Sequence, residues 1–456
     1  MIGVYTSLKI ETHDDWFVAG RSLGLLPLVG TMFATTVSTV SLIGYLGYYY
    51  QMGWGGWWNW GGSILSFIIG ALFFSKKLRR LGKRTMSEML EARYGKVHAI
   101  IASVIIFVGM LFFVSAQLVG SAAIVTAAVD VDRNIVILVI GAIFILFTVS
   151  GGMEAVAWTD TFCSAVIFLG TLILMFTALG KVGGIGNLHT TLAQVKPSAL
   201  DPWAGGQISI GIAVSWILTW GIGNYGSPHI VTRINSAKTP EIAAWSQALT
   251  SVASLAFFIP LMLIGLAAIV LFPSIPATDQ ATPYIIKHLL SPWTGGIMMA
   301  SILAAAISTA DSVLLMAGTT FVNDILLKVS KKEYTSKQIL RTSRIATLTI
   351  GVLGIVFSFY TNSGVMWIQA NMVGILGAML SIVVLGAFAW RRANAQGALA
   401  AMVTGVIVAL VWLVLDKPFG LFPILPGSFA ALAAYIIVSL LTPPPPQEVI
   451  DEFFNV

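Results

Sequence analysis

The stretch LAAAISTADSVLL, residues 303–315, lies inside a long apolar run but carries two serines, a threonine and an aspartate. On an α-helix, which turns by about 100° per residue, these polar positions form a stripe. Its members are Ala305, Ser308 and Ser312 on one face, with Thr309 and Asp311 on the flanks. A carboxylate at membrane depth costs at least about 2.5 kcal/mol and usually marks an ion or substrate path. The alternative is a packing role, because hydroxyls in membrane helices often bond to backbone or to a neighbouring helix.

The composition indicates the broad class of protein. Of the 456 residues, 57% are hydrophobic and 10% are charged, and the mean hydropathy is +0.89, whereas about a quarter of residues in soluble proteins are charged. These values predict a polytopic membrane protein. A single cysteine, Cys163, excludes an internal disulfide framework, and no catalytic pair, metal-ligand cluster or nucleotide-binding glycine motif of the usual spacing appears. We therefore expect no enzyme activity and no organic cofactor.

Apolar runs long enough to cross a bilayer recur along the chain. A helix needs about 20 residues to cross about 30 Å of hydrocarbon, and twelve runs reach that length. The predicted spans are 23–50, 55–76, 97–128, 134–153, 160–183, 206–230, 241–272, 294–326, 341–360, 365–389, 395–415 and 420–441. They predict an all-α fold in which the bilayer is the main partner of the chain.

The basic residues are unevenly distributed between the loops. If the helices alternate from a cytoplasmic start, five of the 25 Lys and Arg residues fall in outer loops and the other 20 in inner loops. The outer ones are Arg133, Lys181, Lys196, Lys287 and Lys417. The asymmetry matches the positive-inside rule and predicts a multi-pass protein of the cell (inner) membrane with both ends cytoplasmic. The net charge of +6 is then a topology signal, and we expect no nucleic-acid partner and no obligate protein partner.

Two segments are poorly suited to a continuous membrane helix. The first, GTMFATTVSTVSLIGYLG (30–47), is rich in β-branched and hydroxyl residues. The second, TWGIGNYGSPHIVTR (219–233), contains the helix breakers Gly221, Gly223, Gly226 and Pro228. A broken helix exposes carbonyls, which with hydroxyls provide the oxygens that sodium requires. Because the segments occupy corresponding positions in two five-helix halves, they favour an inverted-repeat transporter over a glycine-rich packing surface.

Four motifs occur together along the chain: DDWFVAGRSLG (14–24), TVSGGMEAVAWTD (148–160), GSPHIVTR (226–233) and AAAISTADSVLL (304–315). With them the chain resembles members of the sodium:solute symporter family over nearly its whole length, and the proline, pantothenate and monocarboxylate carriers in particular. The resemblance implies a LeuT-like fold of two inverted repeats of five transmembrane helices plus two C-terminal helices. Family members usually have one more helix before the first motif. Here that helix is either truncated or absent from the protein.

The resemblance divides the chain into six parts. They are a cytoplasmic N-terminal segment (1–22), a first inverted repeat (23–183), an extracellular loop (184–205), a second inverted repeat (206–389), two peripheral helices (390–441) and a cytoplasmic proline-rich tail (442–456).

The resemblance also implies two ion sites. The first binds sodium through the carbonyls of Ala34, Val37 and Ala305 and the hydroxyls of Ser308 and Thr309. The second, present in some relatives, would use Asp160, Asp311 and Ser312 beside Ser308. Asp311 replaces a hydroxyl of that pattern, so either a second ion or a proton is the expected occupant. No metal other than sodium is expected.

The candidate solute-binding residues are Gln117, Trp220, Asn224, Trp367 and Gln369. Proline carriers resemble one another in having Tyr where this chain has Asn224, which disfavours simple proline transport. Free amides at the start of a half-helix favour an anion, so we expect a small carboxylate or amino acid, moved with sodium by alternating access. The alternatives are a proton-coupled carrier of the same fold and a membrane sensor or channel that does not transport by this mechanism.

Overall fold

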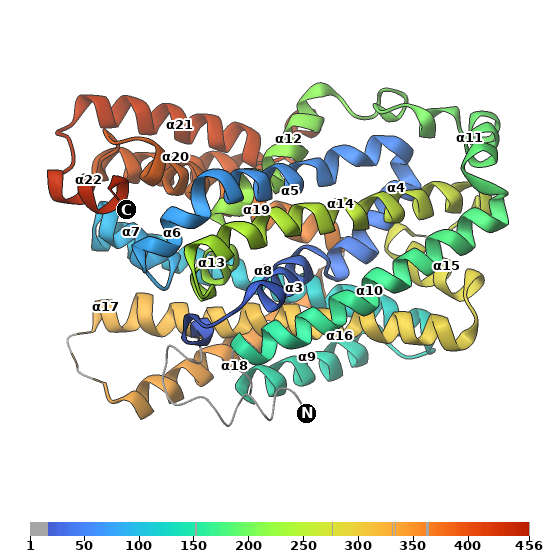
Figure 1. The fold of residues 1–456 in the computed structure, drawn as a ribbon, viewed down its shortest axis with the longest axis horizontal. Coiled ribbons are helices and arrows are strands. Elements are labelled where there is room, and N and C mark those ends of the chain that lie inside the picture. Colours follow the sequence, from blue (N-terminus) through green and yellow to red (C-terminus); the bar gives the residue numbers. More distant parts are fainter. Residues whose placement is uncertain are drawn as a thin grey trace.

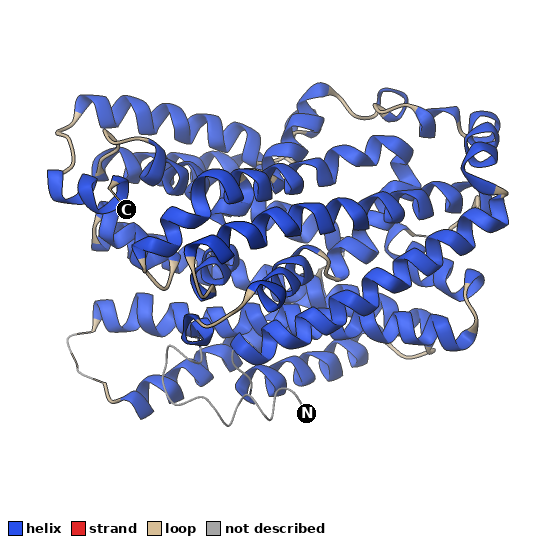
Figure 2. Cartoon of the chain, in the orientation of Figure 1, coloured by secondary structure: helices blue, strands red, loops and turns tan. Residues whose placement is uncertain are grey.

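The computed structural model describes residues 17–150, 153–275, 277–330, 332, 334–361 and 364–455. Helices make up the secondary structure of these residues (Figure 2), apart from one isolated β-bridge. Residues 1–16 of the predicted N-terminal segment (1–22) lie outside the described residues.

The helices of the first half begin with an interrupted one. The chain forms α3 (Leu25–Thr36), leaves the helical path, and resumes through a π-helical turn (Val40–Tyr45) into α4 (Leu46–Met52). The next helices are α5 (Trp57–Ile69), α6 (Ser75–Leu81), α8 (Lys96–Ala128), α9 (Arg133–Ser150) and α10 (Met153–Val182).

The start of α10 corrects a prediction. The sequence placed the start of this span at residue 160, but the helix begins at Met153. Glu154 lies in its first turn, where a negative charge interacts favourably with the helix dipole. Asp160 therefore lies about two turns inside α10 and not at its interfacial end.

Several helices of the second half start at side-chain caps. The side chains of Ser209, Thr239, Ser291 and Thr335 each accept a hydrogen bond from a backbone N–H in the first turn of the helix that follows. The helices are α12 (Ile210–Trp220), α13 (Pro228–Ser236), α14 (Pro240–Leu271), α16 (Pro292–Thr319), α17 (Leu327–Val329), α18 (Ser336–Tyr360), α19 (Val365–Ala389), α20 (Ala395–Val414) and α21 (Ile424–Leu441).

Four shorter helices lie in segments predicted to be loops or tail. They are α7 (Met86–Tyr94), α11 (Gly184–Val195), α15 (Ala281–Leu289) and α22 (Gln447–Phe454). Figure 1 shows α11 and α22 at opposite ends of the molecule. The helix α22 follows the prolines and is held by an ion pair of 2.8 Å between Lys83 and Glu452 and by the fully buried ring of Phe453.

Nine helices among the described residues are long and apolar enough to cross a membrane. The three predicted spans outside this set are 23–50, 134–153 and 206–230. The first and third are broken into short pieces, whereas the span 134–153 corresponds to the continuous helix α9 (Arg133–Ser150). Two of the three differences between nine and twelve therefore come from helix breaks.

The broken helices lie inside the bundle. The helix α3 packs against α10 and α14, and α16 packs against α8, α9 and α10. The helix α19 contacts α8, α20 and α21 and also the turn between α12 and α13. This arrangement brings both interruptions, α16 and α19 into the interior of the molecule.

One β-bridge joins the two broken helices at their ends. Leu23, just before α3, lies parallel to Ala237, just after α13. The N–H of Leu23 donates to the carbonyl of Ser236 over 3.1 Å, and the N–H of Lys238 donates to the carbonyl of Leu23 over 2.9 Å. The entry to α3 and the exit from α13 are thus held by backbone hydrogen bonds.

Candidate functional site

The first interruption follows α3. Val37 has φ −105° and ψ 72°, outside the helical region, and the chain becomes helical again near Val40. The hydroxyl of Ser41 donates a hydrogen bond back across the break to the carbonyl of Thr36. No backbone hydrogen bond among the described residues reaches the carbonyls of Ala34 or Val37. These two oxygens are free to bind a cation.

The second interruption lies between α12 and α13. The helix α12 ends at Trp220, a short 3-10 turn spans Gly223–Gly226, and Pro228 starts α13. A Cβ atom on Gly226 would come within 2.7 Å of the carbonyl oxygen of Leu376, so glycine is required for the close approach of α19. The four predicted breakers all lie in this non-helical segment or at its edges.

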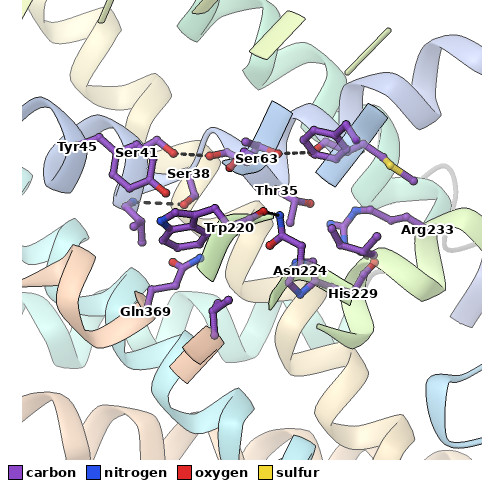
Figure 3. A pocket seen from close by; sticks show the side chains of 16 residues that line it. Thr35, Ser38, Ser41, Tyr45, Ser63, Trp220, Asn224, His229, Arg233 and Gln369 are labelled. Atoms are coloured by element: carbon purple, nitrogen blue, oxygen red, sulfur yellow. Dashed lines mark hydrogen bonds between the residues drawn. The ribbon is translucent and has the colours of Figure 1, made fainter. Parts of the chain in front are cut away.

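A cavity of about 30 Å³ lies between the two interruptions (Figure 3). Its walls come from the break after α3, from α5, from the α12–α13 break and from α19. The labelled side chains around it are Thr35, Ser38, Ser41, Tyr45, Ser63, Trp220, Asn224, His229, Arg233 and Gln369. This volume holds about two water molecules, so a solute of several heavy atoms enters only when the walls move apart.

Three buried polar atoms of this cavity have no hydrogen-bond partner. They are Nε1 of Trp220, Nδ1 of His229 and Oε1 of Gln369. Asn224 differs, because its Nδ2 donates to the carbonyl of Trp220 over 2.6 Å. Buried polar groups are normally satisfied, and the atoms that are not point to an external ligand with both donors and acceptors.

The predicted solute-binding residues separate into two groups. Trp220, Asn224 and Gln369 line the cavity. Gln117 is buried behind it, where its Oε1 accepts a hydrogen bond from Thr39. Trp367 does not line the cavity.

Trp367 belongs instead to a separate aromatic cluster. Its ring centroid lies 5.6 Å from that of Phe422 and 5.8 Å from that of Trp216, and the Nζ atom of Lys417 lies 5.2 Å from its ring centroid. The side chain of Trp367 is 36% exposed. Figure 3 shows Gln369, from the same helix, directed into the cavity.

Several cavity residues were not predicted as solute ligands. Ser38, Ser41 and Thr35 lie in the segment 30–47, whose density of hydroxyls was the available signal. Ser63 comes from α5, and a lone serine in an apolar helix gives no signal of its direction. Arg233 was interpreted as an inner-loop charge, but its side chain is 2% exposed, so that interpretation is wrong.

The residues predicted to bind sodium are all buried. Ala34, Val37, Ala305, Ser308 and Thr309 are each exposed by 5% or less, and α3 contacts α16. The hydroxyls of Ser308 and Thr309 are buried and have no hydrogen-bond partner. Two unsatisfied hydroxyls on α16 and two unbonded carbonyls at the end of α3 are oxygen groups of the kind that bind a hard cation.

Arg233 connects four helices next to this set. Its Nε donates to Thr31 of α3 over 3.0 Å, and its Nη2 donates to Ser312 of α16 over 3.1 Å. The same Nη2 lies 3.8 Å from Oδ2 of Asp160 on α10, which also accepts a hydrogen bond of 2.5 Å from Thr31. Asp160 and Ser312, both predicted for the second ion site, are therefore joined through a guanidinium that the sequence analysis did not assign there.

Asp311 points in a different direction. Its Oδ1 accepts a hydrogen bond of 2.8 Å from Thr148 of α9. Successive residues of a helix are separated by about 100°, so Asp311 and Ser312 face different neighbours. Among the described residues, no hydrogen bond or ion pair joins Asp311 to Asp160 or to Arg233, the residue that donates to Ser312.

The two polar sets lie one helical turn apart. On α3, Ala34 is one turn beyond Thr31 along the chain, and on α16, Ser308 is one turn before Ser312. Because α3 and α16 run in opposite directions in an alternating bundle, both steps lead the same way. The free oxygens thus lie on one side of the Arg233 network.

Comparison with known proteins identifies the family. A model of the sodium:solute symporter family matches residues 16–405. The chain is 24% identical to the high-affinity proline transporter PutP of Bacillus subtilis over 99% of this chain and 98% of that one. It is 26% identical to a sodium/proline symporter of Staphylococcus aureus over 76% of this chain and 70% of the relative.

Solved structures share the fold. A sodium-coupled sialic acid symporter in a substrate-bound, outward-open state matches 98% of this chain and 95% of its own with a TM-score of 0.83 and 22% identity. Mhp1, a nucleobase-cation-symport-1 family transporter in a closed conformation, matches 97% and 99% with a TM-score of 0.63 and 15% identity. The predicted fold class, an all-helical polytopic membrane protein of LeuT-like fold, is confirmed.

The chain belongs to the sodium:solute symporter family. Fold and family together define a multi-pass, sodium-coupled solute symporter, and the prediction that the chain is a transporter and not an enzyme is confirmed.

Proposed function

We propose that this symporter carries a small solute with a carboxylate group, a monocarboxylate or an amino acid, together with sodium by alternating access. One observation carries the proposal: the α12–α13 break places the start of a helix and three unpartnered polar atoms at one cavity. Free N–H groups at a helix start favour an anion. Among the described residues the lining includes no acid, which supports the same solute class.

Individual cavity groups have roles in this proposal. Nε1 of Trp220 donates to a solute oxygen, and Oε1 of Gln369 accepts from a solute N–H or O–H group. Asn224, already bonded to the carbonyl of Trp220, fixes the turn and presents its remaining amide oxygen.

In the same proposal, sodium binds between α3 and α16 through the carbonyls of Ala34, Val37 and Ala305 and the hydroxyls of Ser308 and Thr309. The ion holds the broken helix against its neighbour in the state that also accepts the solute. By thermodynamic linkage, the ion and the solute then raise each other's affinity by the same factor.

Uptake into proteoliposomes tests the proposal. We expect an inward sodium gradient, but not a potassium gradient, to drive accumulation of one member of a panel of proline, short monocarboxylates and pantothenate. Trp220→Phe, which deletes the indole N–H, weakens solute affinity, while the matched change Trp367→Phe outside the cavity does not. Accumulation that is independent of sodium would exclude the proposed coupling.

A proton-coupled carrier is the second candidate. It is favoured by Asp311, a carboxyl group inside a membrane helix whose hydrogen-bond partner is Thr148. In that case a pH gradient drives uptake without sodium, and Asp311→Asn abolishes the effect of the pH gradient.

The direction of transport depends on the orientation of the chain. The positive-inside asymmetry supports cytoplasmic ends and outer loops around Lys181 and Lys417. Single cysteines placed at these positions in a Cys163→Ser background are expected to react with an impermeant maleimide added outside intact cells. A cysteine at Lys332 is expected to react only after the cells are permeabilised.

A further inference from the structure

A second hollow lies away from the central cavity, between α8, α18, α19 and α20. Its volume is about 380 Å³. Its walls are mainly apolar and include Val108, Phe112, Phe357, Leu376 and Leu410. An apolar cavity of about 150 Å³ in a protein core already binds benzene, so this crevice has room for a considerably longer hydrocarbon.

The crevice opens on the lipid-facing surface of the bundle. Val108 of α8 is 49% exposed and Leu410 of α20 is 46% exposed, and both belong to helices long enough to cross the membrane. The walls of the crevice are therefore continuous with the surface that contacts the bilayer. Lipid is the medium that reaches it.

Two polar side chains, those of Thr361 and Asn371, interrupt the apolar walls. Asn371 of α19 lines the crevice, and its Oδ1 is buried with no hydrogen-bond partner. It lies six residues beyond the start of α19 at Val365, which is about 9 Å along the helix. An unpaired amide oxygen at that depth in hydrocarbon is unfavourable, and a donor from a bound molecule removes the penalty.

We propose that this crevice is a binding site for an acyl chain of the surrounding bilayer that ends in an uncharged hydroxyl group, as in a monoacylglycerol. The acyl chain lies along α19 and α20, and its terminal hydroxyl group donates a hydrogen bond to Oδ1 of Asn371. A charged headgroup is disfavoured because Asn371 is neutral and the remaining lining has no charged side chain.

The site is separated from the solute cavity by α19 alone. Asn371, Met372 and Leu376 face the crevice, whereas Gln369 and Val373 line the central cavity. An acyl chain packed against one side of α19 restrains the helix whose other side contacts the solute. Occupancy of the crevice is therefore expected to change the affinity for the solute, and this consequence rests on the proposed function. Binding of the acyl chain to the crevice does not depend on the proposed function.

Photolabelling tests the binding. The purified full chain, in nanodiscs of saturated phosphatidylcholine, is exposed to a diazirine-bearing monoacylglycerol, and the labelled peptides are mapped. We expect label to concentrate on residues 364–376 and 406–413. Leu410→Trp fills the crevice and is expected to remove most of this label. The matched variant Ile407→Trp, on the same helix at a side chain that is 53% exposed but not part of the crevice, is expected to retain it.

The hydroxyl contact has its own control. We expect the protein to bind the monoacylglycerol in preference to the fatty acid methyl ester of the same length. Asn371→Leu is expected to reduce this preference about fivefold, because one neutral hydrogen bond contributes about 1 kcal/mol. Gel filtration and thermal unfolding establish that each variant is folded. Even labelling of all lipid-facing helices, or equal labelling of the two tryptophan variants, overturns the proposal. If the crevice is labelled as expected but its occupancy leaves the solute affinity unchanged, only the proposed coupling between the crevice and the solute cavity is overturned.

Discussion

The hydroxyls at two levels of α16 have different environments. Ser312 accepts a hydrogen bond from Arg233 and donates one of 3.2 Å to the carbonyl of Ser308. One turn away, the hydroxyls of Ser308 and Thr309 are equally buried but have no partner. At the level of Ser312 the positive charge is the side chain of Arg233, which is part of the protein. At the level of Ser308 and Thr309 the hydroxyl oxygens are available to an ion that can dissociate.

This difference distinguishes a structural cation from a transported one. Arg233 contacts α3, α10 and α16, and its positive charge is covalently part of the protein. A site that releases its ion in every cycle needs oxygen ligands that remain stable in the folded protein when the ion is absent. Substitutions at each level test whether the two levels are functionally separate.

The largest expected effect comes from breaking the buried ion pair. Asp160→Leu leaves Arg233 buried without its carboxylate, and such a loss typically costs about 3–5 kcal/mol. We expect a strongly lowered thermal unfolding temperature in detergent, and partial recovery in the double variant Asp160→Leu/Arg233→Met, because no unpaired charge remains. Equal loss in the single and double variants would show that the pair does not act as a unit.

A somewhat smaller effect is expected at the level of the unpartnered hydroxyls. Sodium at a hundred times its dissociation constant stabilises the folded protein by about 2.7 kcal/mol. Ser308→Ala and Thr309→Val are expected to lose most of the increase in unfolding temperature that sodium, compared with potassium at equal ionic strength, produces.

Ser312→Ala provides the matched control for these two variants. It removes a hydroxyl of the same helix that is bonded to Arg233, so the sodium-dependent increase is expected to remain. If Ser312→Ala abolishes the sodium effect as fully as Thr309→Val does, the two levels form one site.

The cavity offers a third test. Trp220→Phe removes one unpartnered donor and keeps the aromatic ring, so solute affinity is expected to fall about five- to tenfold, the effect of one hydrogen bond of about 1 to 1.4 kcal/mol. Sodium-dependent stabilisation in the absence of solute stays unchanged. Isothermal titration with the transported solute and with sodium measures the two effects separately.

The smallest effect concerns a carboxyl group outside the membrane-spanning helices. Burial raises the pKa of Asp279, and a hydrogen bond of 3.1 Å from the N–H of Val365 opposes part of the shift. Because the raised pKa belongs to the folded state, the folded protein holds this proton more tightly than the unfolded chain. Stability from this group is therefore greatest below the ordinary pKa of aspartate and falls as pH rises through the raised pKa.

Asp279→Asn removes that titration and keeps an acceptor for Val365. The difference in unfolding temperature between the two proteins is expected to change in favour of the variant from about pH 4 to about pH 7. A difference that does not depend on pH would mean that the carboxyl group has the same pKa in the folded and unfolded states.

Much of the architecture could be predicted from composition and helix breakers. Glycines and Pro228 determine where the sixth span is interrupted, because these residues disfavour a continuous helix whatever surrounds them. The hydroxyls of Ser308 and Thr309 stood out since apolar residues flank them. The short helices α7 and α11 were missed because a search for apolar runs of about 20 residues does not detect helices of 9 and 12 residues.

The role of Arg233 and the direction of individual side chains could not be predicted. A basic residue near the end of a membrane span fits the positive-inside rule equally well whether it reaches water or the interior. Trp367 and Gln369 lie two positions apart, about 200° around α19, so only the rotation of the helix decides which one faces the cavity. That rotation depends on packing against α8, α20 and α21, which no single segment encodes.

The β-bridge between Leu23 and Ala237 has a consequence for the speed of the transport cycle. Its two backbone hydrogen bonds contribute together about 1 to 3 kcal/mol. A motion that pulls α3 away from α13 must break them, which slows that step by about 5- to 150-fold relative to a motion that keeps them. The bridge therefore favours a transport cycle in which α3 and α13 move together over one in which they separate.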